Sequence, residues 1–108
     1  MQDCVFCKIR DKEIPKEFIY DDEDVMVFPD IAPIKPIHLL VIPKKHVEDF
    51  LDVDPVLFGK LARVVKNTVL KEGLDGKGYR LTVNGGGAQL VNHLHIHITG
   101  PHGKSAKM

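Results

Sequence analysis

The chain has no excess charge of either sign, no long apolar run and only two cysteines. Its 15 basic residues are matched by 15 acidic ones, which gives no field to attract nucleic acid or an anionic membrane. Two cysteines are too few for a disulfide framework. No apolar run approaches the roughly 20 residues of a membrane helix, and the N-terminus lacks the positive charge of a signal peptide. We therefore expect a cytoplasmic protein that works without nucleic acid or a membrane.

The 108 residues suit a single domain, 1–108, and no repeat or low-complexity linker divides them. The clearest element is a helix with Asp54 as N-cap, Pro55 at its first position, and apolar residues at helical spacing until Gly73. Strands are expected at 18–20, 25–28, 38–42, 79–84 and 93–99, a short helical turn within 5–14 and a loose tail at 100–108. This order predicts an α+β fold, with an antiparallel sheet of about five strands, one main helix and a short N-terminal helix.

The two cysteines, Cys4 and Cys7, are separated by two residues at the start of the chain. This spacing is typical of a metal-binding knuckle. A redox pair is the competing interpretation, but such pairs usually follow a strand, and too few residues precede Cys4 to form one. Two ordinary thiols are the third interpretation, so the spacing alone leaves the function of the pair open.

Three of the six histidines alternate with apolar residues in the segment 93–98. On a strand, this period of two sends the apolar residues into the core and places His93, His95 and His97 on the opposite face. A row of imidazoles can bind a metal, relay protons or supply a nucleophile near neutral pH. A solvated polar face is the plain alternative. We disfavour it because the three histidines follow a glycine-rich loop at strict alternation.

The segment 93–99 resembles the signature of the histidine-triad family, and the resemblance extends over nearly the whole chain. Similar segments, in the order and near the spacing of the Hint branch, are Cys4–Ile9, Glu13–Pro15, Phe28–Ile31, His38–His46 and Asn84 with its glycine loop. The resemblance implies a HIT-like fold. It also implies a homodimer, since Hint proteins join their sheets across a two-fold axis.

By this resemblance, His95 attacks the α-phosphate of a nucleoside monophosphate conjugate and forms a covalent nucleotidyl-histidine that water later releases. Neutral imidazole is both a good nucleophile and a good leaving group near pH 7. To attack through one ring nitrogen, it must hold its proton on the other, which needs an acceptor such as a backbone carbonyl. His97 would assist the phosphate or the leaving group, and His38 would support the nucleophile. Without the resemblance, His38 is simply a histidine at a strand end.

The resemblance also assigns nucleotide contacts. Asn84 corresponds to an asparagine that contacts the phosphate, and Asp30 to a carboxylate that accepts the ribose hydroxyls. The other expected nucleotide-binding residues are the base-pocket walls Ile9, Phe28 and Ile31, for which ordinary core is the alternative, and the loop residues Ala88, Gln89 and Leu90.

Three features depart from the Hint pattern. The glycine loop is shorter than in many Hint proteins, with Ala88 where glycine is common. Leu90 replaces a polar residue that is frequent near the phosphate, and the C-terminal tail has no tryptophan. These departures bear on the approach of the phosphate and on the preference for a leaving group.

Many bacterial proteins that resemble this chain bind structural zinc. The corresponding ligands here are Cys4, Cys7, His46 and His93, a closed Cys2His2 set that uses the N-terminal segment 1–15 as a zinc knuckle. Zinc would stabilise a small core without taking part in the reaction. The triad would then contain a structural member, His93, and two catalytic ones, and no organic cofactor is expected.

The function expected from these residues is hydrolysis of a phosphoramidate or related bond in purine nucleotide conjugates. The alternatives are a dinucleoside polyphosphate hydrolase, as in the Fhit branch, a nucleotidyltransferase of the same family, or a nucleotide-binding interaction module with negligible turnover. A zinc hydrolase with all three triad histidines as ligands is disfavoured, because same-face positions on one strand place ligands in a line and not around a tetrahedron.

Overall fold

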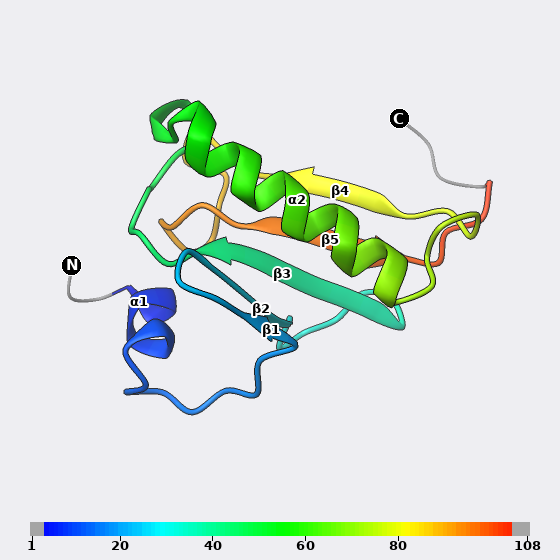
Figure 1. The fold of residues 1–108 in the computed structure, drawn as a ribbon, viewed down its shortest axis with the longest axis horizontal. Helices are drawn as coiled ribbons and strands as arrows, with labels where there is room; N and C mark the ends of the chain where they lie inside the picture. The colour runs from blue at the N-terminus through cyan, green and yellow to red at the C-terminus, as the bar shows by residue number, and fades with distance from the viewer. Residues whose placement is uncertain (1–3, 105–108) are drawn as a thin grey trace.

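The computed structural model describes residues 4–104 and contains a five-stranded antiparallel sheet with the order β1-β2-β3-β5-β4 (Figure 1). The strands are β1 (Tyr20–Asp21), β2 (Val25–Pro29), β3 (Ile37–Pro43), β4 (Arg80–Val83) and β5 (Ile96–Gly100). The helices are α1 (Val5–Arg10), α2 (Pro55–Lys71) and a short 3-10 helix, η1 (Phe50–Asp52). The predicted α+β fold, with one main helix and a short N-terminal one, is confirmed.

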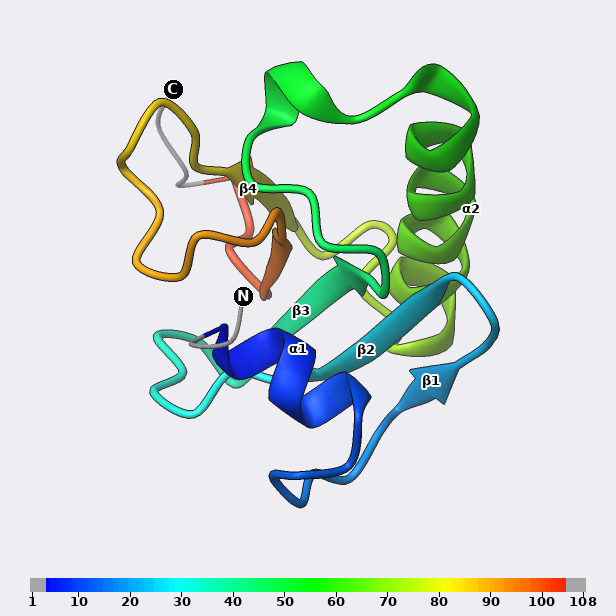
Figure 2. The same cartoon turned by 90° about the vertical axis from the view of Figure 1, so that its left-hand side faces the viewer.

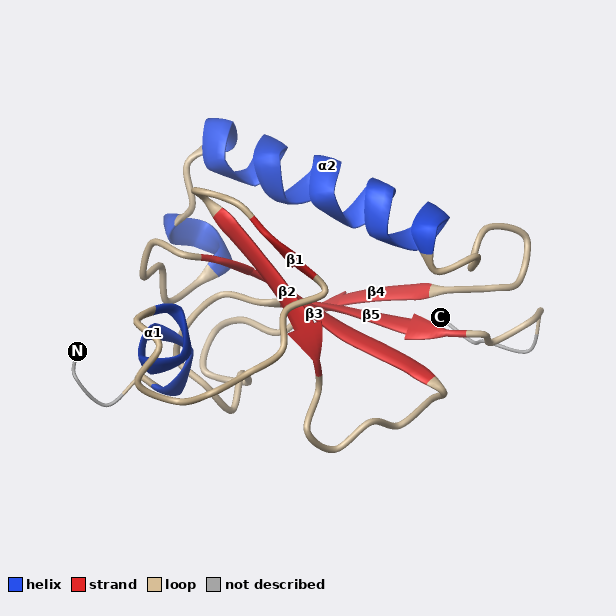
Figure 3. Cartoon of the chain, turned by 60° about the horizontal axis from the view of Figure 1, so that its bottom comes forward, coloured by secondary structure: helices blue, strands red, loops and turns tan. Residues whose placement is uncertain are grey.

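The two α-helices lie on opposite faces of the sheet (Figures 2 and 3). On β2, Val25 and Val27 belong to the core beneath α2, whereas Met26 and Phe28 belong to the core beneath α1. The side chains of β3 alternate in the same way. Leu39 and Val41 belong to the core beneath α2, and Leu40 and Ile42 belong to the core beneath α1. Burial on both faces explains the nearly continuous apolar sequence of the central strands.

Helix α2 has the ends that its sequence predicts. The carboxylate of Asp54 accepts a hydrogen bond from the Leu57 amide at 3.0 Å, and Pro55 occupies the first turn. Gly73, just beyond the helix, has a φ of 71°, a left-handed conformation that favours glycine. The apolar stripe predicted for this helix faces the sheet, with Leu61, Val64 and Val65 buried. No helix among the described residues is both long and apolar enough to cross a bilayer.

Three expected boundaries need correction. The first strand covers Tyr20–Asp21 and not 18–20. The last strand begins at Ile96 and not at residue 93, because the Leu94 amide donates to the carbonyl of Val47, in a loop, instead of to a neighbouring strand. The tail expected to be loose from residue 100 is held at its start. Gly100 ends β5, and the amides of His102 and Gly103 donate to the carbonyls of residues 78 and 77. The rest of the expected tail, 105–108, lies outside the described residues.

Candidate active site and metal centre

The catalytic candidates lie on the sheet face that α1 covers. Strands β3 and β5 are paired so that Leu40 lies opposite His97 and His38 opposite Thr99. Directly opposed residues share a face, so His38 and His97 are diagonal neighbours on the side where Leu40 packs. Ile96 and Ile98 point to the α2 core, as the alternation predicts. The strand pairing therefore brings together histidines that are 59 residues apart.

His95 is held in one tautomer by the main chain. Its Nδ1–H donates to the carbonyl oxygen of His93 at 2.7 Å, so the lone pair remains on Nε2. The ring is buried, with 7% exposure, and the edge of Phe6 packs against it with ring centroids 5.1 Å apart. The carbonyl of His93 is thus the acceptor that a histidine nucleophile requires, and the sequence alone did not reveal it.

A chain of hydrogen bonds fixes the tautomers of the other two histidines. The Ile34 amide donates to His38 Nδ1 at 3.2 Å, which places the proton of His38 on Nε2. That nitrogen lies 2.9 Å from His97 Nδ1 and 3.2 Å from a carboxylate oxygen of Asp30. His97 therefore accepts at Nδ1 and carries its proton on Nε2. Burial, reinforced by the neighbouring histidines His95 and His38, lowers the pKa of His97, which favours the neutral ring in the free protein.

A pocket of about 470 Å³ opens beside His95 and His97. It is lined by Val5, Phe6, Ile9, Ile14, Pro15, Lys16, Phe28, Asp30, Ile31, Leu40, Asn84, Ala88, Leu90, Val91, His95 and His97. Of the expected catalytic and nucleotide-binding residues, two do not line it: Gln89, which supports the loop, and His38, which lines an adjoining hollow with Asn84 and His97. The structure thus gathers residues from both ends of the chain around the candidate nucleophile.

The sequence did not predict several walls of this pocket, among them Phe6, Ile14, Pro15, Lys16 and Leu40. Most of these belong to α1 and the segment after it. The sequence indicated a short helical turn within 5–14 but not which sheet face it would cover, because that depends on packing between distant elements.

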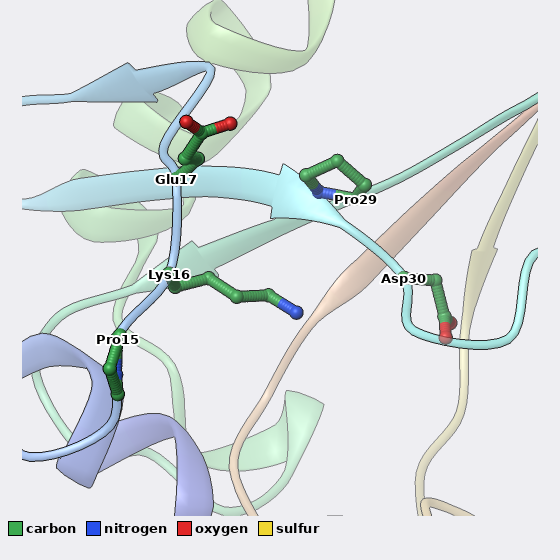
Figure 4. Close-up of a pocket in the computed structure, with 5 residues that line it drawn as sticks. All are labelled: Pro15, Lys16, Glu17, Pro29 and Asp30. Carbon is green, nitrogen blue, oxygen red and sulfur yellow. The ribbon is translucent and has the colours of Figure 1, made fainter.

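A second, shallow hollow of about 580 Å³ adjoins the pocket on the side of β2. Figure 4 shows the side chain of Lys16 extending toward the end of β2, where Pro29 and Asp30 lie. Pro15, Lys16 and Asp30 line both this hollow and the deeper pocket. The pocket is therefore open on the side of Asp30, where a bulky group could extend.

The four predicted zinc ligands converge at the other end of the site. The Nδ1 atom of His93 lies 3.2 Å from Cys4 Sγ and 3.2 Å from Nδ1 of His46, which itself lies 3.3 Å from Cys7 Sγ. All four ligand atoms lie within 4.8 Å of one another. The Nε2–H of His93 donates to the Pro43 carbonyl at 2.7 Å, which directs the Nδ1 lone pair toward the thiols. Such a second hydrogen bond is typical of histidines that bind metals.

The protonation states of the histidines and cysteines in this cluster also suit metal binding. Burial lowers the pKa of His93 to about 4, so the ring is neutral near pH 7 and its lone pair is available. Burial, with the adjacent Cys4 as a further cause, raises the pKa of the Cys7 thiol, so that its thiolate needs a nearby cation. Two thiols and two imidazole nitrogens around one centre fit a tetrahedral zinc ion.

A second group with metal-ligand spacing consists of Asp30, His38 and His97. The Ile34 amide occupies Nδ1 of His38, so neutral His38 carries a proton on Nε2 and offers no lone pair there. This group is better described as a hydrogen-bonded chain than as a metal site. Neither of the two groups found among the described residues contains all three triad histidines, which weighs against the zinc-hydrolase interpretation.

Comparisons with known proteins identify the family of this chain. The HIT domain family model matches residues 11–104. Protein HitA of Neisseria gonorrhoeae is 42% identical over 104 residues, which cover 93% of this chain and 97% of the relative. The crystal structure of a HIT family hydrolase from Legionella pneumophila has 39% identity and a TM-score of 0.86, with 98% of this chain and 96% of that one covered. A histidine triad nucleotide-binding protein from Candida albicans has 32% identity and a TM-score of 0.82, with 88% and 72% covered. The chain therefore belongs to the HIT domain family.

Proposed function

We propose that the protein is a nucleotide-binding hydrolase that cleaves the P–N or a related bond at the α-phosphate of purine nucleoside monophosphate conjugates. The observation that carries this proposal is the tautomer of His95, whose Nδ1–H is bound by the His93 carbonyl while Nε2 keeps its lone pair beside a pocket. The Legionella relative is described as a hydrolase and the Candida relative as nucleotide-binding, which supports the same assignment.

The reaction has two displacements at phosphorus. His97 takes up a proton when the phosphate anion binds and becomes an imidazolium. Nε2 of His95 then forms a bond to the α-phosphorus as the bond to the leaving nitrogen breaks, and the Nε2–H of the imidazolium donates its proton to that nitrogen. His97 then has a lone pair on Nε2 and can take a proton from the water that attacks the nucleotidyl-histidine. The bond between phosphorus and His95 breaks, which releases the nucleoside monophosphate and restores both histidines.

The remaining pocket residues bind and orient the substrate. Asn84 supplies an amide donor to a phosphate oxygen that gains charge during the displacement. Asp30 accepts the ribose hydroxyls, and the amide of Ala32 already fixes its Oδ1 at 2.9 Å. Phe28 and Ile9 are buried and form the floor for the base, whereas Ile31 is 89% exposed and forms a rim that a bound base would cover.

One observation favours a second candidate, a nucleotide-binding module with negligible turnover. Leu90 at the end of the glycine loop is fully exposed and offers no hydrogen bond to a phosphate. Hydrolysis of a dinucleoside polyphosphate, or transfer of the nucleotide to another acceptor, would use the same nucleophile. The leaving group and the acceptor, and not His95, distinguish these reactions.

The proposal is tested by intact-mass spectrometry of protein quenched during turnover of an adenosine phosphoramidate. We expect the mass of one added adenylate, and fragmentation should locate it on His95. Parallel reactions with a diadenosine polyphosphate test whether the alternative substrate class is consumed faster. Binding of adenosine monophosphate without an adduct or any consumption of either substrate would instead support the binding module.

We also propose that the protein forms a homodimer through the free edge of β4. Within the sheet, β4 pairs only with β5, and it exposes the apolar side chains of Leu81 and Val83, next to Tyr79. An exposed apolar edge strand is a ready site for pairing with a second copy across a two-fold axis. In this arrangement each Leu81 lies near the axis and close to its own equivalent.

A Leu81→Glu variant is therefore expected to shift the dimer toward monomer, because it places two like charges near the axis. Analytical ultracentrifugation over a range of protein concentrations measures the change, and at least a tenfold weaker association is expected. Leu70→Glu is the matched control, since Leu70 is an exposed leucine on α2. A wild-type protein that sediments as a monomer at all concentrations would refute the dimer.

A further inference from the structure

The glycine loop beside the pocket is tied to the segment His46–Leu51, which we call the strap. The carboxylate of Asp49 joins the two. Its Oδ1 accepts the amide of Gly86 at 2.7 Å, and its Oδ2 accepts the amide of Leu51 at 3.1 Å. The bond from Gly86, followed by that from Leu51, lowers the pKa of Asp49, so this carboxylate remains ionised at neutral pH.

The close approach of loop and strap depends on glycine. A Cβ atom at Gly85 would lie 3.0 Å from Asp49 Oδ1, within the tightest range of such contacts. Gly86 has a φ of 66°, a left-handed conformation that other residues rarely adopt. Glycine at these two positions therefore lets the loop rest on the carboxylate without a close contact or backbone strain.

A second tie lies nearby. The side chain of Gln89 donates from Nε2 to the Glu48 carbonyl at 2.9 Å and accepts the Gly87 amide at 3.1 Å. Within the loop itself, the Ala88 amide donates to the Gly85 carbonyl at 3.2 Å and closes a turn. Three consecutive glycines have large conformational freedom, so the loop needs such external bonds to keep one shape.

The loop carries pocket residues at both of its ends. Asn84 precedes the glycines, and Ala88 and Leu90 follow them, and all three line the pocket. Asp49 lies outside the group of described residues that line it. Asp49 therefore acts on the geometry of a bound nucleotide through the loop and not by contact.

We propose that Asp49 is a positioning residue of the active site, whose carboxylate holds the glycine loop in the shape that presents Asn84 to the α-phosphate. This role rests on the proposed nucleotide function. Its benefit is preorganisation, because a loop already fixed in the free protein loses little conformational entropy when the phosphate binds. A direct electrostatic effect of Asp49 would instead weaken phosphate binding, since a carboxylate repels a phosphate.

Two substitutions separate loop positioning from simple capping of η1. Asp49→Ser keeps an oxygen that can accept the Leu51 amide, but its shorter side chain does not reach Gly86. Asp49→Ala loses both bonds. If positioning of the loop matters, both variants should lower kcat/KM for an adenosine phosphoramidate by about tenfold or more, and both should speed hydrogen exchange at the Gly86 amide. Asp52→Ala, which removes an exposed carboxylate of the same short helix, is the matched control.

The outcomes test the role of Asp49 separately from the proposed nucleotide function. Wild-type kcat/KM and Gly86 exchange in Asp49→Ser, with a defect only in Asp49→Ala, would make Asp49 a helix cap and overturn the proposal. Unchanged turnover in both variants would do the same while leaving the hydrolase assignment intact. A wild-type protein that neither binds adenosine monophosphate nor consumes a nucleotide conjugate would refute the proposed function, and this role for Asp49 with it.

Discussion

A His95→Ala variant is expected to lose on the order of 10⁴-fold or more in turnover of an adenosine phosphoramidate, equivalent to about 5 kcal/mol of transition-state stabilisation. The loss is large because the variant has no atom that can form the bond to phosphorus, and residual catalysis would come only from binding and from His97. Adenosine monophosphate should still bind within severalfold of the wild type, because Asp30 and the apolar walls remain. Single-turnover kinetics and calorimetric titration measure the two effects separately.

The matched control is His102→Ala, which removes a partly buried imidazole that does not line the pocket. That variant should keep nearly the wild-type rate. Full activity in His95→Ala would eliminate this residue as the nucleophile. Loss of nucleotide binding together with activity would instead indicate that the substitution damages the pocket, for example through the contact between Phe6 and His95.

Removal of zinc is expected to have the second large effect, on stability. At a zinc concentration a thousandfold above its dissociation constant, a metal bound only by the folded state adds about 4 kcal/mol. For a chain of this size, a loss of that amount lowers Tm by roughly 15 °C or more. Chelation of the wild-type protein, or a Cys7→Ser substitution, should therefore lower Tm by a similar amount, as measured by calorimetry.

Metal analysis completes this test. Wild-type protein should contain one zinc per chain, and Cys7→Ser much less. Chelator should have little further effect on the Tm of the variant, because its site is already impaired, and this comparison controls for unspecific effects of the chelator. A wild-type protein that contains no zinc after growth with the metal, and whose Tm does not respond to chelator, would rule out the structural zinc site.

His93 connects the two sites on which these predictions depend. Its ring offers Nδ1 to the cysteine cluster, and its main-chain carbonyl accepts the proton of the nucleophile. Its burial, at 0% exposure, fixes both groups in place. The contacts of the triad members therefore differ, since the ring of the first lies in the cysteine cluster and the next two line the pocket. We propose that this difference divides the triad into a structural member and two catalytic ones.

Much of this fold could be predicted because the deciding signals are local. Asp54 and Pro55 begin α2 and Gly73 ends it through bonds and backbone angles within a few residues. The alternation of histidines with Leu94, Ile96 and Ile98 predicted which side chains enter the core, and all three are buried there. The start of β5 was misplaced because the pattern continues past the point where a partner strand is available.

The sequence by itself determined the class of fold, the main helix, the two faces of the histidine-containing strand and the residue types able to act as nucleophile and ligands. These properties follow from periodicity, capping and side-chain chemistry, which act over short stretches of chain. Only the tertiary structure decided which ring nitrogen of each histidine carries the proton, that α1 forms a wall of the pocket, and that Asp49 holds the glycine loop. Each of these depends on contacts between segments that are far apart in the sequence, and such contacts exist only after the sheet and its two cores have formed.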